Sequence, residues 1–181
     1  MTFSSLRLLL SSAVFVLALS ASHAAGRDGH WVPTWVSAQQ LTEPGNMPPA
    51  PGLAERSLRQ IIQPTLAGTR LRVVISNQYG EKPLVIAGAR IARSTGASGI
   101  DLSTDRAVTF NGRAGVTVLP GTSMMSDDVT FAVEAFENLA ISVHVLDVPE
   151  QLTGHPGSRT TSFIQRGDAL AQASWPDAQQ T

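Results

Sequence analysis

The segment from Thr69 to Ala92 constrains the fold more than any other part of the chain. Inside it, apolar positions alternate with mostly polar ones, and the apolar set is Leu71, Val73 and Ile75. A period of two is the pattern of a β-strand with one buried face. A second apolar run begins at Leu84, after a turn supplied by Asn77, Gly80 and Pro83. The segment therefore predicts two strands joined by a turn, in an all-β domain.

Further strand candidates follow at short intervals. Together with 70–77 and 84–92 they cover residues 107–110, 116–119, 129–133 and 139–146, with glycine, proline or asparagine turns between them. An earlier stretch around Leu58, Ile61 and Ile62 fits a short helix or a strand that ends at Thr65, and we interpret it as a strand. This spacing predicts an antiparallel β-sandwich of the jelly-roll kind.

The first residues have the composition of a secretory signal peptide. Arg7 precedes an apolar run from Leu8 to Leu19, and the small residues Ser22 and Ala24 mark a cleavage site. The run is too short for a membrane span. We expect a secreted protein, periplasmic or extracellular, that begins at Ala25; a buried N-terminal helix is the alternative.

Composition narrows the class of partner. Removal of residues 1–24 leaves 157 of the 181 residues. It removes one of the 13 basic residues and none of the 14 acidic ones, so the net charge of the mature chain is −2 with histidine neutral. This length suits one domain with one core. Lys82 is the only lysine and the arginines are scattered, so we expect no nucleic-acid partner. The absence of cysteine excludes disulfides and thiolate chemistry.

Proline and glycine mark the expected boundaries. Residues 25–56 form an irregular N-terminal segment that includes the proline-rich linker Asn46–Gly52. Residues 57–166 carry the sandwich. Residues 167–181 are rich in Ala, Gln and Asp and lack a periodic pattern, so we expect a tail that cannot order itself alone and that leads to a missing catalytic domain.

Several short blocks follow one another in an order that is found in a known family. They are Leu58–Gln60, Ser76–Leu84, Arg106–Gly112, Val116–Val129 and Leu139–Val143, preceded by Trp35–Gln39. These blocks resemble the β-rich N-terminal region of secreted SGNH (GDSL) ester hydrolases. The resemblance implies a non-catalytic domain that packs on a catalytic domain and shapes the entrance for acyl or acetyl esters of lipids or polysaccharides.

The resemblance also implies where the chemistry of that family lies. A Gly-Asp-Ser-Leu-like nucleophile block, an oxyanion hole of glycine and asparagine, and an Asp-x-x-His block would follow the β region. None of them occurs in this sequence. Gly167–Leu170 resembles the first block, but Ala169 replaces serine and the strand and helix of a nucleophile elbow are missing, so we interpret it as a turn. We predict no catalytic residue here and no activity of the chain alone.

Three residues are candidates for an interface or a substrate rim. Tyr79 lies in the predicted turn, and His155 lies in a loop that abuts the catalytic domain in the resembling family, although an exposed turn is the simpler interpretation. His144 lies in the predicted strand 139–146, opposite its apolar face. We interpret it as a surface histidine or one beneath a neighbouring domain, because no carboxylate stands at a spacing that indicates a general base.

We predict neither a cofactor nor a metal. Asp101–Asp105 offers alternate oxygen ligands, but Arg106 stands where a calcium loop has glycine, and no bidentate glutamate follows. The histidines have no metal-binding spacing. A stand-alone module that binds cell-wall or extracellular glycans is the alternative function, because exposed aromatic rings such as Tyr79 stack on sugars.

Overall fold

The computed structural model describes residues 30–158 and 160–181 of a chain that divides into two units, Met1–Pro33 and Thr34–Thr181. The predicted signal peptide lies outside the described residues. Strands make up 44% of the structure and helices 4%, which confirms the all-β fold. In the part of the chain that is described, no helix is long and apolar enough to cross a membrane.

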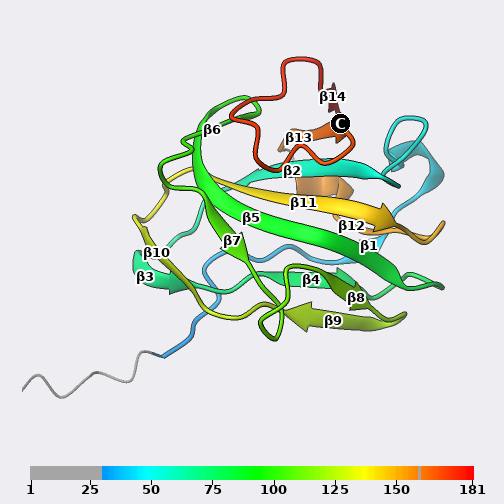
Figure 1. Ribbon diagram of the computed structural model, residues 1–181. Coiled ribbons are helices and arrows are strands. Elements are labelled where there is room, and N and C mark those ends of the chain that lie inside the picture. The colour runs from blue at the N-terminus through cyan, green and yellow to red at the C-terminus, as the bar shows by residue number, and fades with distance from the viewer. Residues whose placement is uncertain (1–29, 159) are drawn as a thin grey trace, which may run out of the picture. The chain divides into compact units, whose positions relative to one another are not determined.

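The larger layer of the second unit is an antiparallel sheet in the order β14-β13-β2-β11-β5-β6, with β7 and β8 also paired to β5 (Figure 1). Its strands are β2 (Arg56–Ile62), β5 (Leu84–Gly96), β6 (Gly99–Ile100), β7 (Arg106–Val108), β8 (Val116–Val118), β11 (Leu139–Asp147), β13 (Ser162–Arg166) and β14 (Gln179–Gln180). The predicted strand at Leu58–Ile62 is confirmed as β2.

The smaller layer consists of two antiparallel pairs on the opposite side of the core (Figure 1). They are β3 (Gly68–Leu71) with β10 (Val129–Val133), and β4 (Val74–Asn77) with β9 (Thr122–Met125). A third pair, β1 (Gln40–Leu41) with β12 (Thr153–Gly154), and two 3-10 turns, η1 (Pro44–Asn46) and η2 (Pro156–Ser158), lie in the connecting segments.

The strand predicted over 70–77 is interrupted at Arg72 and Val73, between β3 and β4. The side-chain Oγ of Ser126 accepts the Val73 amide at 2.9 Å, and the Ser126 amide donates to the Val73 carbonyl at 2.8 Å. The Ser126 hydroxyl therefore accepts the hydrogen bond that a backbone carbonyl would accept in a continuous strand. The predicted alternation is still correct, because Leu71, Val73 and Ile75 pack against the core while Arg72 and Val74 are exposed.

The core lies between the two layers. Its buried members come from both layers and are Ala89, Ile91, Val108, Phe110, Val129, Phe131, Val133 and Leu139. Burial of these apolar side chains is the main favourable term in the folding of a sandwich that has no disulfide.

The turn between β4 and β5 is fastened to β8 by one amide side chain. Nδ2 of the buried Asn77 donates to the Lys82 carbonyl at 2.8 Å and to the Val118 carbonyl at 3.0 Å. Gly80 packs so closely that a Cβ there would lie 1.9 Å from Oδ1 of Asn77 and 2.9 Å from Cγ of Pro149. The Ser76–Leu84 block therefore requires asparagine and glycine for a structural reason.

The C-terminal tail, residues 167–181, packs against the larger sheet of the same unit. It lies on the outer side of the larger sheet (Figure 1, red), where Trp175 is 2% exposed and packs with Phe163 and Ala169. The sequence carried no periodic signal because one tryptophan and a few hydrogen bonds hold this segment, rather than an apolar face. The Gly167–Leu170 stretch is a turn, as predicted, with Gly167 at φ 70°.

We predict that Gly80→Ala destabilises the protein by about 1–3 kcal/mol, because the new methyl group meets Asn77 and Pro149. Gly45→Ala is the matched control, since nothing lies within 4 Å of its added Cβ. Urea unfolding of both variants measures the difference. Equal stabilities would show that the turn is not tightly packed.

Candidate functional site

The structure places two of the three candidate residues in neighbouring segments. The Tyr79 amide donates to Oγ1 of Thr153 in β12 at 2.9 Å, and the Tyr79 hydroxyl donates to the Gln39 carbonyl at 3.4 Å. His155 directly follows β12, and its Nδ1 is buried without a hydrogen-bond partner. The Tyr79 turn, β12 and the segment that leads into β1 therefore meet, and the Tyr79 ring stays 41% exposed.

His144 lies elsewhere, in the middle of the outer face of the larger sheet. It stands between Ser57 of β2 and Gly88 of β5, and it is only 9% exposed. The prediction of a surface histidine is wrong, because the tail of the same unit covers this face: Leu170 lies 3.0 Å from the position that a Cβ of Gly88 would occupy. Nδ1 of His144 is buried and has no partner.

Ser57 is the serine next to His144, and its hydroxyl is fully engaged. Oγ donates to the Gly167 carbonyl at 2.9 Å and accepts the Ala169 amide, also at 2.9 Å. On its other side in the sheet stands Gln165, whose Oε1 is buried without a partner. Ser57 therefore holds the tail turn onto the sheet and is not free to act as a nucleophile.

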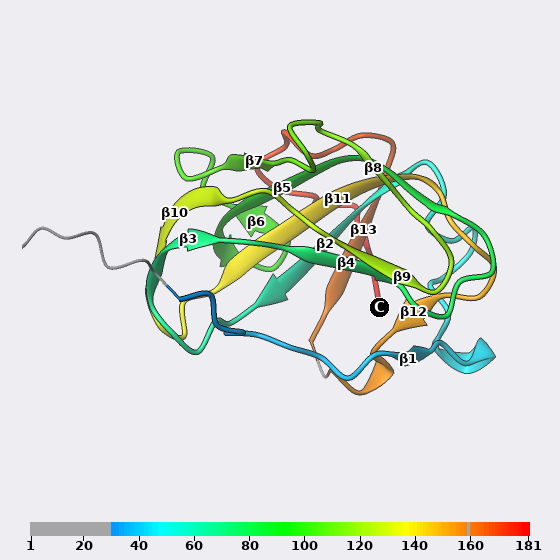
Figure 2. The same ribbon diagram turned by 90° about the horizontal axis from the view of Figure 1, so that it is seen from below.

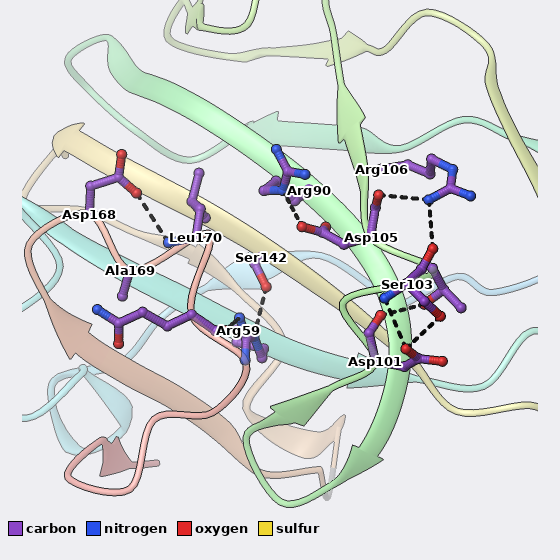
Figure 3. Close-up of polar contacts among 12 residues, drawn as sticks. Arg59, Arg90, Asp101, Ser103, Asp105, Arg106, Ser142, Asp168, Ala169 and Leu170 are labelled. Atoms are coloured by element: carbon purple, nitrogen blue, oxygen red, sulfur yellow. Dashed lines mark hydrogen bonds and ion pairs between the residues drawn. The ribbon is translucent and has the colours of Figure 1, made fainter.

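Arg59 is the centre of this buried face (Figure 3). Its Nε donates to Oγ of Ser142 at 2.8 Å, one Nη donates to the Ser98 carbonyl, and the other donates to the Gln172 carbonyl at 3.2 Å. The guanidinium also stacks over Trp175, 4.0 Å from the ring centroid. Burial lowers the pKa of Arg59 from its usual value to about 10, an effect that the charge of Asp105 partly opposes.

A polar loop borders the same face (Figure 3). Arg90 of β5 pairs with the nearly buried Asp105 at 2.6 Å. Asp101 accepts the Ser103 hydroxyl at 2.7 Å and the Ser103 amide at 2.9 Å, and these bonds hold the pKa of Asp101 below its usual value. The carboxylates of the Asp101–Asp105 stretch therefore stabilise a turn and an ion pair, which is the ordinary structural use of such residues.

Asp127 holds the turn that follows β7. Its carboxylate accepts the Gly112 amide at 2.8 Å, the Thr109 hydroxyl at 2.7 Å and the Asn111 amide at 3.0 Å. These donors, the Gly112 amide first, lower the pKa of Asp127. Asn111 and Gly112 both have positive φ, which explains the Asn-Gly pair in the sequence.

This arrangement has the chemistry of a buried structural network. Within residues 30–158 and 160–181, no carboxylate hydrogen-bonds to His144, and no group of three or more His, Asp or Glu is placed to hold a metal ion. Ser57 and Arg59 use their donors and acceptors to fasten the tail, whereas Nδ1 of His144 and Oε1 of Gln165 are buried without a partner.

Sequence reasoning missed the residues that organise this face, namely Arg59, Ser142 and Trp175. The sequence did show which residues share the second face of β2, because side chains alternate between the two faces of a strand. That face carries Ser57, Arg59 and Ile61. The sequence did not show that this face is buried, because an arginine on a strand ordinarily faces water.

A comparison of the chain with models of known protein families and with curated proteins finds no match.

We predict that Trp175→Ala lowers the free energy of unfolding by about 3–5 kcal/mol, because it removes the buried ring that packs the tail onto the larger sheet. Leu102→Ala, at a side chain that is 50% exposed, is the control and changes stability by less than about 0.5 kcal/mol. Urea unfolding measures both. A loss as small as that of the control would mean that the tail is not part of the folded unit.

The lowered pKa of Asp127 predicts an acid-dependent contribution to stability. The stabilisation is fully present above the unfolded-state pKa, near 3.8, and is lost as the pH falls through the lower folded-state pKa. Asp127→Asn is therefore less stable than wild type at pH 7, and the gap narrows below about pH 3.8. Urea unfolding across this pH range checks the sign, with Asp177→Asn in the exposed part of the tail as control. A gap that widens on acidification contradicts it.

Proposed function

We propose that this chain is the non-catalytic N-terminal β-sandwich portion of a secreted SGNH-type ester hydrolase. Its role is to pack on a catalytic domain, joined to it or separate, and to shape the entrance for acyl or acetyl esters of lipids or polysaccharides. The proposal starts from the order of the sequence blocks that resemble the family, Leu58–Gln60 to Leu139–Val143.

One observation carries the proposal: the family-like blocks build the scaffold, and the nearest serine and histidine are sealed inside it. Asn77 and Gly80 lock the turn of the second block against β8. Ser57 and His144 lie beneath the tail, where Ser57 bonds to the tail backbone. A domain with this division of roles needs catalytic groups from a partner.

The turn that resembles a nucleophile block supports the same view. Ala169 stands at the position of the serine and is 1% exposed, with its amide bonded to Ser57. A serine side chain there would point into packed protein rather than into a substrate cleft. Residues 1–24 have the composition of a signal peptide, which supports a location outside the cytoplasm.

A stand-alone glycan-binding module is the second candidate. The observation in its favour is the exposure of two aromatic rings, Trp35 at 44% and Tyr79 at 41%, on segments joined through Gln39. Exposed rings of this type stack on sugar faces.

We predict that the purified chain does not hydrolyse p-nitrophenyl acetate above the buffer rate. We also predict that the DNA beyond codon 181, or a neighbouring gene, encodes Gly-Asp-Ser and Asp-x-x-His blocks. Serine-dependent turnover by the chain alone would contradict the proposal. A clean stop codon without such blocks, together with retention of the chain on insoluble cell-wall polysaccharide, would favour the glycan-binding candidate.

A further inference from the structure

The two layers of the sandwich leave an opening between β7 and β10. Each strand lies at an edge of its layer, β7 beside β5 and β10 beside β3, and the two strands are neighbours in Figures 1 and 2. Within residues 30–158 and 160–181, no strand pairing joins β7 to β10. The opening is a cavity of about 490 Å³, a volume typical of pockets that hold small ligands.

Hydrogen bonds close the opening at its two ends. At one end, the Asp127 amide donates to the Thr109 carbonyl at 2.8 Å. At the other end, Nη2 of Arg93 in β5 donates to the Ala132 carbonyl at 2.7 Å. The strand edges stay apart between these two bonds, so the cavity is part of the folded sandwich and not a gap at a loose end.

The walls of the cavity combine charged and apolar side chains. The charged lining residues are Arg93, Arg106 and Asp128, and the apolar ones include Ala107 and Ala132. Both alanines are exposed, so their methyl groups are open to a ligand. Walls of this mixed kind suit a ligand that carries a charged group on a less polar body.

Arg106 is the lining residue whose charge is available. Its Nη1 donates to the Ser103 carbonyl at 3.1 Å and to the Asp105 carbonyl at 2.9 Å, which holds one edge of the guanidinium in place (Figure 3). Nε and Nη2 have no partner in the part of the chain that the structure describes. The neighbouring Asp105 carboxylate does not neutralise this charge, because it pairs with Arg90 at 2.6 Å.

The other charged groups around the cavity are already paired. Arg93 forms an ion pair with Glu137. The two oxygens of Asp128 are engaged by separate arginines, since Oδ2 lies 3.0 Å from Nη1 of Arg70 and Oδ1 lies 2.6 Å from Nε of Arg72. The carboxylate on the wall therefore has both oxygens occupied, and an anion that enters the cavity meets an arginine-rich surface.

We propose that the cavity between β7 and β10 binds a small organic anion, with the oxyanion group on Arg106 and the body of the ligand against Ala107 and Ala132. The Nε and Nη2 donors lie on the same edge of a guanidinium, and this planar pair fits two oxygens of one carboxylate or phosphate. The site goes beyond the proposed function and does not depend on it, because every group that forms it belongs to this chain.

An exposed apolar pair of the smaller layer lies outside the cavity. Val74 and Met125 face each other across β4 and β9, and each is 53% exposed. Arg72 lies between this pair and the cavity wall, since its Nη1 is 3.7 Å from Sδ of Met125 while its Nε bonds to Asp128. The pair does not line the cavity and is no part of the proposed site.

The experiment is an NMR titration of the chain with glucuronate, glucose 6-phosphate and glucose, which share a ring and differ in charge. We expect an anion to shift amides of residues 104–107 and 128–132, whereas glucose leaves them unchanged. Arg106→Gln weakens anion binding by about tenfold or more, because a bidentate charged contact is lost. Arg166→Gln is the matched control, since Arg166 is exposed in β13 and does not line the cavity.

A second pair of variants leaves the guanidinium unchanged. Thr130 is an exposed lining residue of β10, so Thr130→Glu places a carboxylate on the wall that repels the ligand. Thr130→Gln has a similar size without the charge. We expect the glutamate variant to bind either anion about tenfold or more weakly than the glutamine variant.

Each outcome decides the proposal. Binding of both anions supports the site, and binding of only one supports it and specifies the oxyanion group. Equal binding of glucose, shifts that cluster away from β7 and β10, or equal affinities of Arg106→Gln and Arg166→Gln overturn it. No shift with either anion up to about 10 mM also overturns it. None of these results alters the proposed function, which p-nitrophenyl acetate and the neighbouring DNA test separately.

Discussion

The buried guanidinium of Arg59 is the interaction on which the outer half of the structure depends. It lies between β11, the β6 turn and the tail, and it meets only neutral oxygen acceptors and the face of Trp175. A buried charge is costly unless its donors are satisfied, so the segments that supply those acceptors must stay in place together. The lowered pKa of Arg59 reports the same desolvation.

This constraint explains why β11 is buried on both faces. Leu139 contributes to the core between the layers, while Ser142 and His144 lie beneath the tail. An antiparallel sheet usually has one face exposed to water. Here the fifteen residues of the tail, 167–181, cover that face, although their sequence has no strand pattern. The tail is therefore structural, and Ser57 and Arg59 beneath it are engaged in holding it in place.

The outer face of the larger sheet is closed by the tail of the same unit, whereas several aromatic and aliphatic side chains elsewhere remain exposed. Groups with catalytic potential are sealed, as Ser57 shows through its two bonds to the tail. Apolar groups with binding potential, such as Trp35, are left open.

The sequence by itself determined the all-β fold, most of the strands of the larger sheet and the turns between them, because alternation and turn chemistry are local properties. It also placed Tyr79 in a turn. Only the tertiary structure decided that His144 is buried, that Arg59 faces inward and that Trp175 orders the tail. The physical reason is distance: Arg59 and Trp175 are far apart in the sequence, and no local pattern reveals which segment covers the second face of a sheet.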